Sequence, residues 1–289
     1  MKSETELKEI VKNKYSEIAL QDKEYNSSSC CGATESCSEV YNIMSEDYSA
    51  LEGYNQEADL GLGCGLPTQF AEIKKGDTVI DLGSGAGNDC FVARAETGET
   101  GKVIGIDFTP AMIEKARQNA ESRGVVNVEF RQGDIETMPV SDDSADVVVS
   151  NCVLNLVPNK NAVFAEIFRV LKPGGHFSIS DIVLEGELPQ EVYTVAEMYA
   201  GCVSGAVARD EYLEGINNAG FQHVRIQKDK EINVPEDVLR AHLSDEGVEE
   251  YKKSKGVIRS ITVYGVKPTD DGKRVKEDKA SCTPGSCCC

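Results

Sequence analysis

The chain has 289 residues, 40% of them hydrophobic, and a formal net charge of −19. This length fits one large domain with appendages or two small domains. The negative charge argues against nucleic acid and against an anionic membrane surface as partners, because both require basic protein surface. No run approaches about eighteen apolar residues, and the first residues are charged without an apolar signal core, so we expect a cytoplasmic protein.

Eleven cysteines are distributed unevenly along the chain. Three lie near the start and four at the very end, and the body of the chain holds Cys64, Cys90, Cys152 and Cys202. Without an export signal, we expect reduced thiols rather than a disulfide framework.

The N-terminal part combines a helix with polar connections. Residues Glu4 to Gln21 carry apolar side chains at helical spacing, and we expect a helix that docks on the body or covers its cleft. A polar, cysteine-containing linker follows from Asn26 to Ser38. Leu60–Pro67 is too rich in glycine for a regular element, which predicts a loop whose backbone can approach a ligand and which carries Cys64. We assign residues 1–60 to an N-terminal extension.

From Thr78 onward, predicted strands and helices alternate, which indicates a parallel sheet covered on both faces. The predicted strands are Val79–Leu82, Val103–Asp107, Val128–Gln132, Ala145–Ser150, His176–Ile182, Val224–Gln227 and Ile258–Val266. The predicted helices are Cys90–Glu96, Pro110–Ser122, Asn161–Leu171, Glu191–Tyr199, Asp210–Ala219 and Pro235–Leu243. We therefore expect an α/β, Rossmann-like domain over residues 61–268 and, by composition, a disordered cysteine-rich tail over residues 269–289.

Local signals define several boundaries within this pattern. Asn88 to Arg94 predicts a capped helix start. Thr109-Pro110 predicts another, with the Thr109 hydroxyl as the cap and proline at the first helical position. The run Lys172–Gly175 predicts a helix stop and a turn into the next strand.

The stretch Thr78–Gly87, T-V-I-D-L-G-S-G-A-G, joins a buried strand to a glycine loop. Gly83, Gly85 and Gly87 stand at alternate positions, which allows a tight turn and lets a ligand lie against the backbone. The dinucleotide fingerprint would need a glycine at position 88, which is Asn88, and the phosphate-loop pattern is absent. One alternative is a purely structural turn in another α/β protein.

Carboxylates near this loop favour a nucleoside without a pyrophosphate. Asp107 ends the next strand about twenty residues on, where a carboxylate accepts the ribose hydroxyls of an adenosine. S-adenosylmethionine fits, since its positive charges suit a site that carries Asp81. Asp134 either accepts from an adenine amino group, beside Ile135 as an apolar wall, or is a solvated loop residue. The predicted cofactor site consists of Asp81, Gly83, Ser84, Gly85, Gly87, Asp107, Met112, Asp134, Ile135 and Asn151.

Three cysteines of the body share a setting that suits a substrate site. Cys152 follows a buried strand, and Cys64 and Cys202 lie in segments bracketed by glycine. Each is compatible with a small core residue, but together they can converge at one mouth, where thiolates suit a soft, thiophilic substrate. Zinc would need four ligands, typically with a C-x-x-C pair that the body lacks. Trivalent arsenic takes three thiolates and keeps a lone pair that can attack a methyl sulfonium.

Several segments are informative together: G-L-G-C-G-L-P, D-L-G-S-G-A-G-N-D-C-F, I-G-I-D-F-T-P-A-M-I-E-K-A-R, S-N-C-V-L-N-L, R-V-L-K-P-G-G and G-C-V-S-G-A. From about Gly61 to Phe221 the chain thereby resembles the arsenite S-adenosylmethionine methyltransferases. The cofactor motifs are shared by many methyltransferases, whereas S-N-C-V-L-N-L with G-C-V-S-G-A is specific.

The resemblance implies a class I methyltransferase fold and arsenite detoxification by methylation. It implies that Cys64, Cys152 and Cys202 bind arsenic, and that Cys30 or Cys31 takes part in disulfide exchange. Arsenite, or its glutathione conjugate, would exchange its ligands onto the three thiols, and its lone pair would attack the methyl group. We expect no metal cofactor, and glutathione or thioredoxin as reductant. Vicinal thiols between Cys282 and Cys289 could capture arsenite.

Two other functions are compatible with the sequence. One is a small-molecule C- or O-methyltransferase in which the cysteines are merely buried. The other is a non-catalytic thiol protein that sequesters arsenic or metal ions, as the terminal cysteines suggest.

Overall fold

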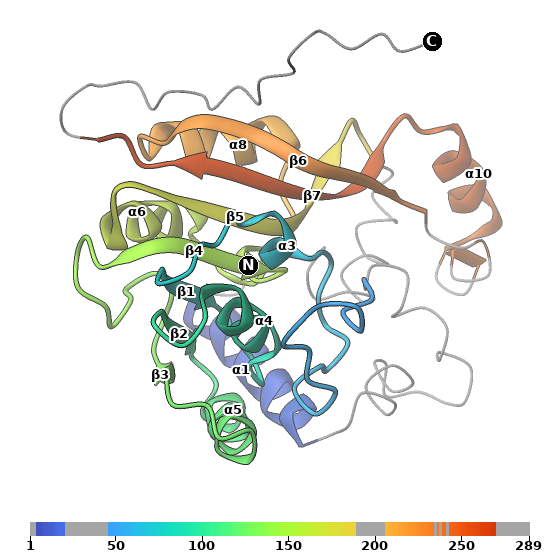
Figure 1. Cartoon of the computed structure of the whole chain (residues 1–289). Coiled ribbons are helices and arrows are strands. Elements are labelled where there is room, and N and C mark those ends of the chain that lie inside the picture. The colour runs from blue at the N-terminus through green and yellow to red at the C-terminus, as the bar shows by residue number, and fades with distance from the viewer. Residues whose placement is uncertain are drawn as a thin grey trace, which may run out of the picture.

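Apolar and β-branched residues place strand β1 (Thr78–Leu82) in the interior of a seven-stranded sheet. The computed structural model describes residues 4–20, 46–188, 206–233, 236, 239–240 and 243–269. Within them the strand order is β3-β2-β1-β4-β5-β7-β6 (Figure 1). β1 pairs in parallel with β2 (Lys102–Asp107) and with β4 (Ala145–Asn151), so the carboxyl ends of these three strands meet at one edge.

The remaining strands extend the sheet in both directions. β3 (Val128–Gln132) pairs in parallel with β2, and β5 (Leu171–Glu185) pairs in parallel with β4. β7 (Val257–Val266) runs antiparallel between β5 and β6 (Gln222–Ile232). The Rossmann-like architecture is confirmed, but the prediction of a parallel sheet holds only for the first five strands. β6 and β7 are consecutive strands that pair directly, which antiparallel strands do without a crossover.

Helices cover both faces of the sheet. The helices are α1 (Glu4–Ala19), α3 (Pro67–Phe70), α4 (Asn88–Thr97), α5 (Pro110–Ser122), a 3₁₀ turn η2 (Leu154–Leu156), α6 (Lys160–Val170), α8 (Arg209–Asn218) and α10 (Asp245–Lys253). Alternation along β1 places Val79 in the core formed with α1, α4 and α5, and Ile80 and Leu82 in the core formed with α6 and α8. No described helix combines the length and apolar character needed to cross a membrane.

Several predicted helix starts and turns differ from those in the structure. α4 begins after Gly87, without a side-chain cap, and the predicted Thr109 cap is also wrong. The Thr109 hydroxyl accepts no N–H from the first turn, and the Thr109 N–H separately donates to Asp107 Oδ1 (2.8 Å). α6 stops at Val170, but Lys172–Gly175 forms a bulge inside β5 rather than a turn before it, since Ala145 pairs with Leu171 and Val147 with His176.

Other predictions were incomplete or fall outside the described residues. Helix α10 was missed because six of its nine residues are charged, which leaves no apolar periodicity. The Ser244 hydroxyl caps it by accepting from the Gly247 N–H (3.1 Å). The predicted helix Glu191–Tyr199 and the tail after Thr269 lie outside the described residues. Only parts of the predicted helix Pro235–Leu243 are described.

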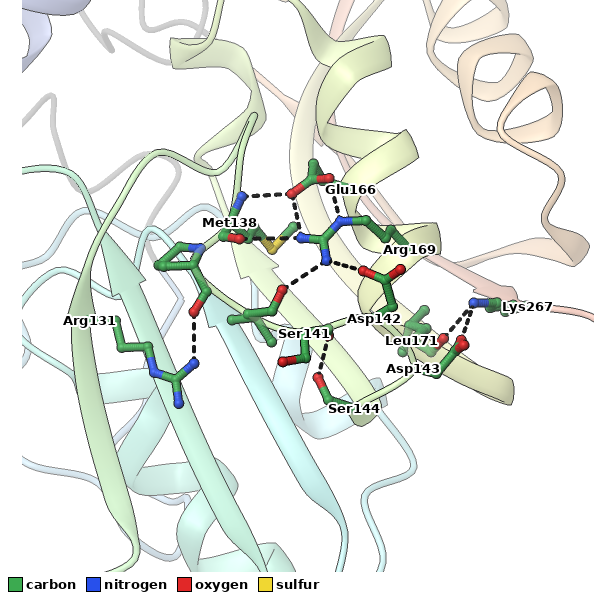
Figure 2. Close-up of polar contacts among 12 residues, drawn as sticks. Arg131, Met138, Ser141, Asp142, Asp143, Ser144, Glu166, Arg169, Leu171 and Lys267 are labelled. Carbon is green, nitrogen blue, oxygen red and sulfur yellow. Dashed lines mark hydrogen bonds and ion pairs between the residues drawn. The ribbon is translucent and has the colours of Figure 1, made fainter.

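Arg169 fastens the segment between β3 and β4 to α6 (Figure 2). Its guanidinium donates to both carboxylate oxygens of Glu166 (2.6 and 2.7 Å), to Asp142 (2.6 Å) and to the carbonyls of Val140 (2.8 Å) and Met138 (3.2 Å). Glu166 in turn accepts from the Met138 N–H (2.6 Å). This clamp fixes the loop whose other end carries two predicted cofactor residues.

We predict that Arg169→Lys lowers the free energy of unfolding by about 1–3 kcal/mol, because an ammonium cannot replace a planar fork that serves several acceptors. Arg240→Lys is the control, since Arg240 pairs with exposed carboxylates, those of Glu236 and Asp245, and we expect no measurable shift in its unfolding midpoint. Denaturant unfolding of both variants measures this. Equal midpoints for the two variants would contradict the role assigned to the clamp.

Candidate cofactor and thiol site

The glycine loop between β1 and α4 turns through left-handed backbone at every second residue. Gly83, Gly85 and Gly87 have φ angles of 65°, 51° and 98°. The predicted tight turn is therefore confirmed, and each position favours glycine on backbone grounds. The turn brings the Gly85 N–H to Asp107 Oδ2 at 3.0 Å, which ties the loop to the end of β2.

The three glycines differ in what surrounds them. A Cβ at Gly83 would lie 2.4 Å from Val153 Cγ2, and one at Gly87 would lie 2.8 Å from Phe130 Cζ, so both are required by packing. A Cβ at Gly85 would have only Met112 Sδ within reach, at 4.0 Å. Gly85 therefore leaves its backbone open to the adjoining cavity.

One cavity at the carboxyl edge of the sheet brings together most of the predicted cofactor residues. Its lining includes Asp81, Gly83, Ser84, Gly85, Asp107, Met112, Asp134, Ile135 and Asn151, and also Cys152. Gly87 does not line it, because its Cα packs beneath the loop against Phe130. Lining residues that the sequence reasoning missed include Tyr15, Tyr48, Asp59, Asp89 and Phe108.

The cavity wall carries carboxylates with no described cation beside them. Asp81 and Asp107 are 2% and 7% exposed, and Asp89 is partly buried. Among the described residues, none of the three forms an ion pair with a basic side chain. Burial raises the pKa of Asp89 to about 6. Burial also raises the pKa of Asp81 well above its usual range, and the neighbouring carboxylates raise it further.

Hydrogen bonds from backbone and side-chain donors offset only part of the cost of burying these carboxylates. Burial also raises the pKa of Asp107, against the N–H donors of Thr109 and Gly85. Cys90 Sγ donates to Asp81 Oδ2 (3.2 Å). This hydrogen bond gives a role to Cys90, a buried cysteine to which the sequence analysis assigned none. The Ser84 hydroxyl is buried and has no hydrogen-bond partner among the described residues. A ligand with a positive charge and a hydrogen-bonding group fits this lining.

Helix α1 covers the cavity, as the amphipathic pattern predicted. It lies beside α5 (Figure 1), and Lys8, Val11 and Tyr15 line the cavity. Lys8 Nζ donates to Asp134 Oδ2 (2.7 Å) and pairs with Glu136. Burial opposes the charge of Lys8, but these hydrogen bonds outweigh it and raise the pKa of its ammonium. Asp134 is therefore tied to α1, and its predicted contact with an adenine stays a prediction.

Cys64 and Cys152 are both buried, at 1% and 3% exposed, and form no disulfide with each other. The Cys152 N–H donates to the Ser180 carbonyl on β5 (2.8 Å), and the Cys64 carbonyl accepts from the Ser260 hydroxyl on β7 (2.6 Å). Cys152 has a φ of 60°, which is uncommon for a residue with a side chain. Cys152 lines this cavity; Cys64 does not, although the preceding residue, Gly63, does.

A buried pair of titratable residues, Tyr212 and Asp181, was also missed from the sequence. The Tyr212 hydroxyl lies 3.2 Å from Asp181 Oδ2, and burial raises the pKa of Asp181 to about 7. Burial and Asp181 raise the pKa of the Tyr212 phenol well above its usual range.

The other predicted thiols lie outside the described residues. These are Cys202, Cys30, Cys31 and the cysteines from Cys282 to Cys289. Within the described part of the chain, which includes two of the three predicted arsenic ligands, no group of three or more histidine, cysteine or acidic side chains is arranged to hold a metal ion.

Known proteins share this fold and sequence. The family described as "Methyltransferase domain" matches residues 73–230. The arsenite methyltransferase of Halobacterium salinarum is 43% identical over 76% of this chain and 59% of its own length, and that of Aquipseudomonas alcaligenes is 32% identical over 82% and 68%. The crystal structure of an arsenic(III) S-adenosylmethionine methyltransferase from Chlamydomonas reinhardtii matches with a TM-score of 0.60 and 36% identity, over 70% of this chain and 66% of that one.

The chain covers only part of the length of these relatives. The chain spans about 59% of the halobacterial relative's length and 68% of the pseudomonad relative's. The family match over residues 73–230 contains the glycine loop, Asp107 and Cys152. The chain is thus a methyltransferase-domain protein and belongs to the arsenite methyltransferase family.

Proposed function

We propose that this protein transfers a methyl group from S-adenosylmethionine to trivalent arsenic held by the thiolates of Cys64, Cys152 and Cys202. The observation that carries the proposal is that Asn151 hydrogen-bonds the loop that carries Cys64, while its neighbour Cys152 lines a cavity suited to a cationic nucleoside. Asn151, the residue before Cys152, binds the backbone of Cys64 (3.1 Å) and itself lines that cavity. The names of the curated relatives support the same substrate.

The cavity residues suit the cofactor by charge and by shape. S-adenosylmethionine supplies an electrophilic methyl group on a positively charged sulfur. Asp81 and Asp89 would offset positive charge, and Asp107 keeps acceptor capacity for ribose hydroxyls beyond its two backbone donors. Met112 and Ile135 supply apolar surface, Ser84 a hydroxyl, and Gly85 an uncovered backbone.

The thiols would bind and orient the substrate. Replacement of an As–O bond by an As–S bond releases the hydroxyl together with the thiol proton as water, so each exchange is balanced without a separate base. Holding arsenic beside the cofactor cavity supplies proximity and orientation, which is the main contribution when little acid–base chemistry is needed. The glutathione conjugate of arsenite as substrate, glutathione or thioredoxin as reductant, a role for Cys30 or Cys31, and a cytoplasmic location belong to this proposal.

We predict that Gly85→Ala raises the Kd for S-adenosylmethionine about tenfold, because its methyl group would occupy the open wall of the cavity. Gly124→Ala is the matched control: Gly124 has a φ of 63°, and nothing lies within 4 Å of its Cβ position. Both variants carry a left-handed backbone penalty of roughly 1–2 kcal/mol. Calorimetry measures the affinity for S-adenosylmethionine, and thermal unfolding measures the loss of stability. Unchanged affinity in Gly85→Ala would contradict the assignment of the glycine loop to the cofactor site.

We predict that affinity for S-adenosylmethionine falls about tenfold as the pH drops from 7.5 to 5. The pKa of Asp89 is about 6, so its carboxylate is mostly protonated at pH 5 and must lose a proton before it can offset a cation. Affinity for S-adenosylhomocysteine, which lacks the sulfonium charge, should change less, and Asp89→Asn should flatten the profile. Identical pH profiles for the two ligands would contradict the assignment of Asp89.

We predict that arsenite and S-adenosylmethionine, with glutathione or thioredoxin as reductant, yield methylated arsenic and S-adenosylhomocysteine, and that Cys152→Ser lowers turnover at least about a hundredfold. The reductant is needed because the arsenic lone pair forms the new As–C bond, which leaves arsenic pentavalent until two thiol electrons reduce it. Cys90→Ser is the control for arsenite binding, since its thiol is occupied with Asp81. Arsenical speciation by chromatography with mass detection measures the products. Methylation of an organic acceptor by Cys152→Ser would favour the small-molecule alternative, and stoichiometric arsenite binding without turnover would favour sequestration.

A further inference from the structure

The Asn151 side chain binds both sides of the loop that carries Cys64. Its Oδ1 accepts from the Cys64 N–H (3.1 Å), and its Nδ2 donates to the Gly65 carbonyl (2.9 Å). Only a side chain with a donor and an acceptor on one planar group can make both bonds, which an amide does and a carboxylate or an alkyl group does not. Because Asn151 immediately precedes Cys152, one side chain connects the two thiol-bearing segments.

The orientation of this amide is fixed by its other neighbours. Nδ2 also donates to the Tyr48 hydroxyl and lies 3.3 Å from Asp89 Oδ2. Tyr48 donates to the same carboxylate (2.9 Å). A carbonyl and a carboxylate on one side of the amide require its nitrogen to face them, so its oxygen faces the Cys64 N–H.

The glycines that bracket Cys64 allow the loop to approach these partners. A Cβ at Gly63 would lie 2.6 Å from Asn151 Nδ2, and one at Gly65 would lie 2.5 Å from Ser180 Oγ. Ser180 is also the residue whose carbonyl accepts from the Cys152 N–H. The Cys64 loop and the Cys152 backbone therefore both lie against Asn151, which ends β4, and its paired residue Ser180 within β5.

We propose that Asn151 is a positioning residue that sets the separation of the Cys64 and Cys152 thiols and thereby the geometry with which they bind one arsenic atom. This inference rests on the proposed function, because it assigns the two thiols to one substrate. It moves Asn151 from the role predicted from the sequence, a contact near the cofactor's sulfur, to a role in the substrate site. Its effect is exerted through the backbone of Cys64 rather than through contact with the arsenic.

Phenylarsine oxide tests the thiol geometry without turnover, because its arsenic binds two thiols at once. The experiment uses the full-length chain in which all cysteines except Cys64, Cys90 and Cys152 are replaced by serine. We expect one-to-one binding that Cys64→Ser or Cys152→Ser abolishes. We expect Asn151→Leu to raise the Kd for phenylarsine oxide at least about tenfold, since it loses both bonds to the loop.

Asn155→Leu is the matched control in the same background. Asn155 is buried in the turn after β4 and donates to the Ile182 carbonyl (2.8 Å), which is outside the Cys64 loop. We expect Asn155→Leu to lower the unfolding temperature while leaving the Kd for phenylarsine oxide within about twofold of the parent.

The outcomes separate this inference from the proposed function. Failure of the parent chain to bind phenylarsine oxide through Cys64 and Cys152 would overturn the shared thiol site itself. Tight binding by the parent together with unchanged affinity in Asn151→Leu would overturn the positioning role alone. An equal loss of affinity in Asn151→Leu and Asn155→Leu would also overturn it, because general destabilisation would then account for both.

Discussion

The site is organised around carboxylates that the fold buries without a described cation. Asp81 and Asp107 lie at the carboxyl ends of β1 and β2, where the parallel pairing of these strands places them at one edge. Burial disfavours their charged forms, and the thiol of Cys90 and the amides of Gly85 and Thr109 offset only part of this cost. A positively charged ligand relieves the remainder. The same burial that costs stability in the ligand-free fold therefore favours the binding of a cationic ligand.

A continuous set of hydrogen bonds joins this cavity to the loop that carries Cys64. Asp89 accepts from Tyr48 and Asn151, and Asn151 holds the backbone on both sides of the Cys64 peptide. Tyr48 is fully enclosed, so burial and Asp89 raise the pKa of its phenol and keep it a hydrogen-bond donor. A cation beside Asp89 would act on the same carboxylate that orients Asn151. The cavity and the Cys64 loop therefore share one side chain, that of Asn151, which contacts Asp89 and the backbone of the loop.

Sequence reasoning succeeded where a residue's role follows from its position along a regular element. The apolar run into Asp81, the alternate glycines and the spacing to Asp107 specify strand, turn and strand end, and these recur in the structure. It failed where the partner is remote in sequence. Tyr48 meets Asp89 across 41 residues and Asn151 meets Cys64 across 87, and no local pattern encodes such contacts. The Thr109 hydroxyl was also predicted wrongly, since it accepts no N–H from the first turn of α5.

The backbone of Cys152 gives a separate reason to assign its side chain a function. A left-handed conformation costs a residue with a Cβ roughly 1–2 kcal/mol, whereas glycine adopts it freely. If the fold required only the turn after β4, glycine would provide it at lower cost. The hydrogen bond from the Cys152 N–H to Ser180 stabilises the turn whatever the side chain, so it does not account for cysteine. What cysteine adds at this position is a thiol at the wall of the cavity that holds Asp81 and Asp107.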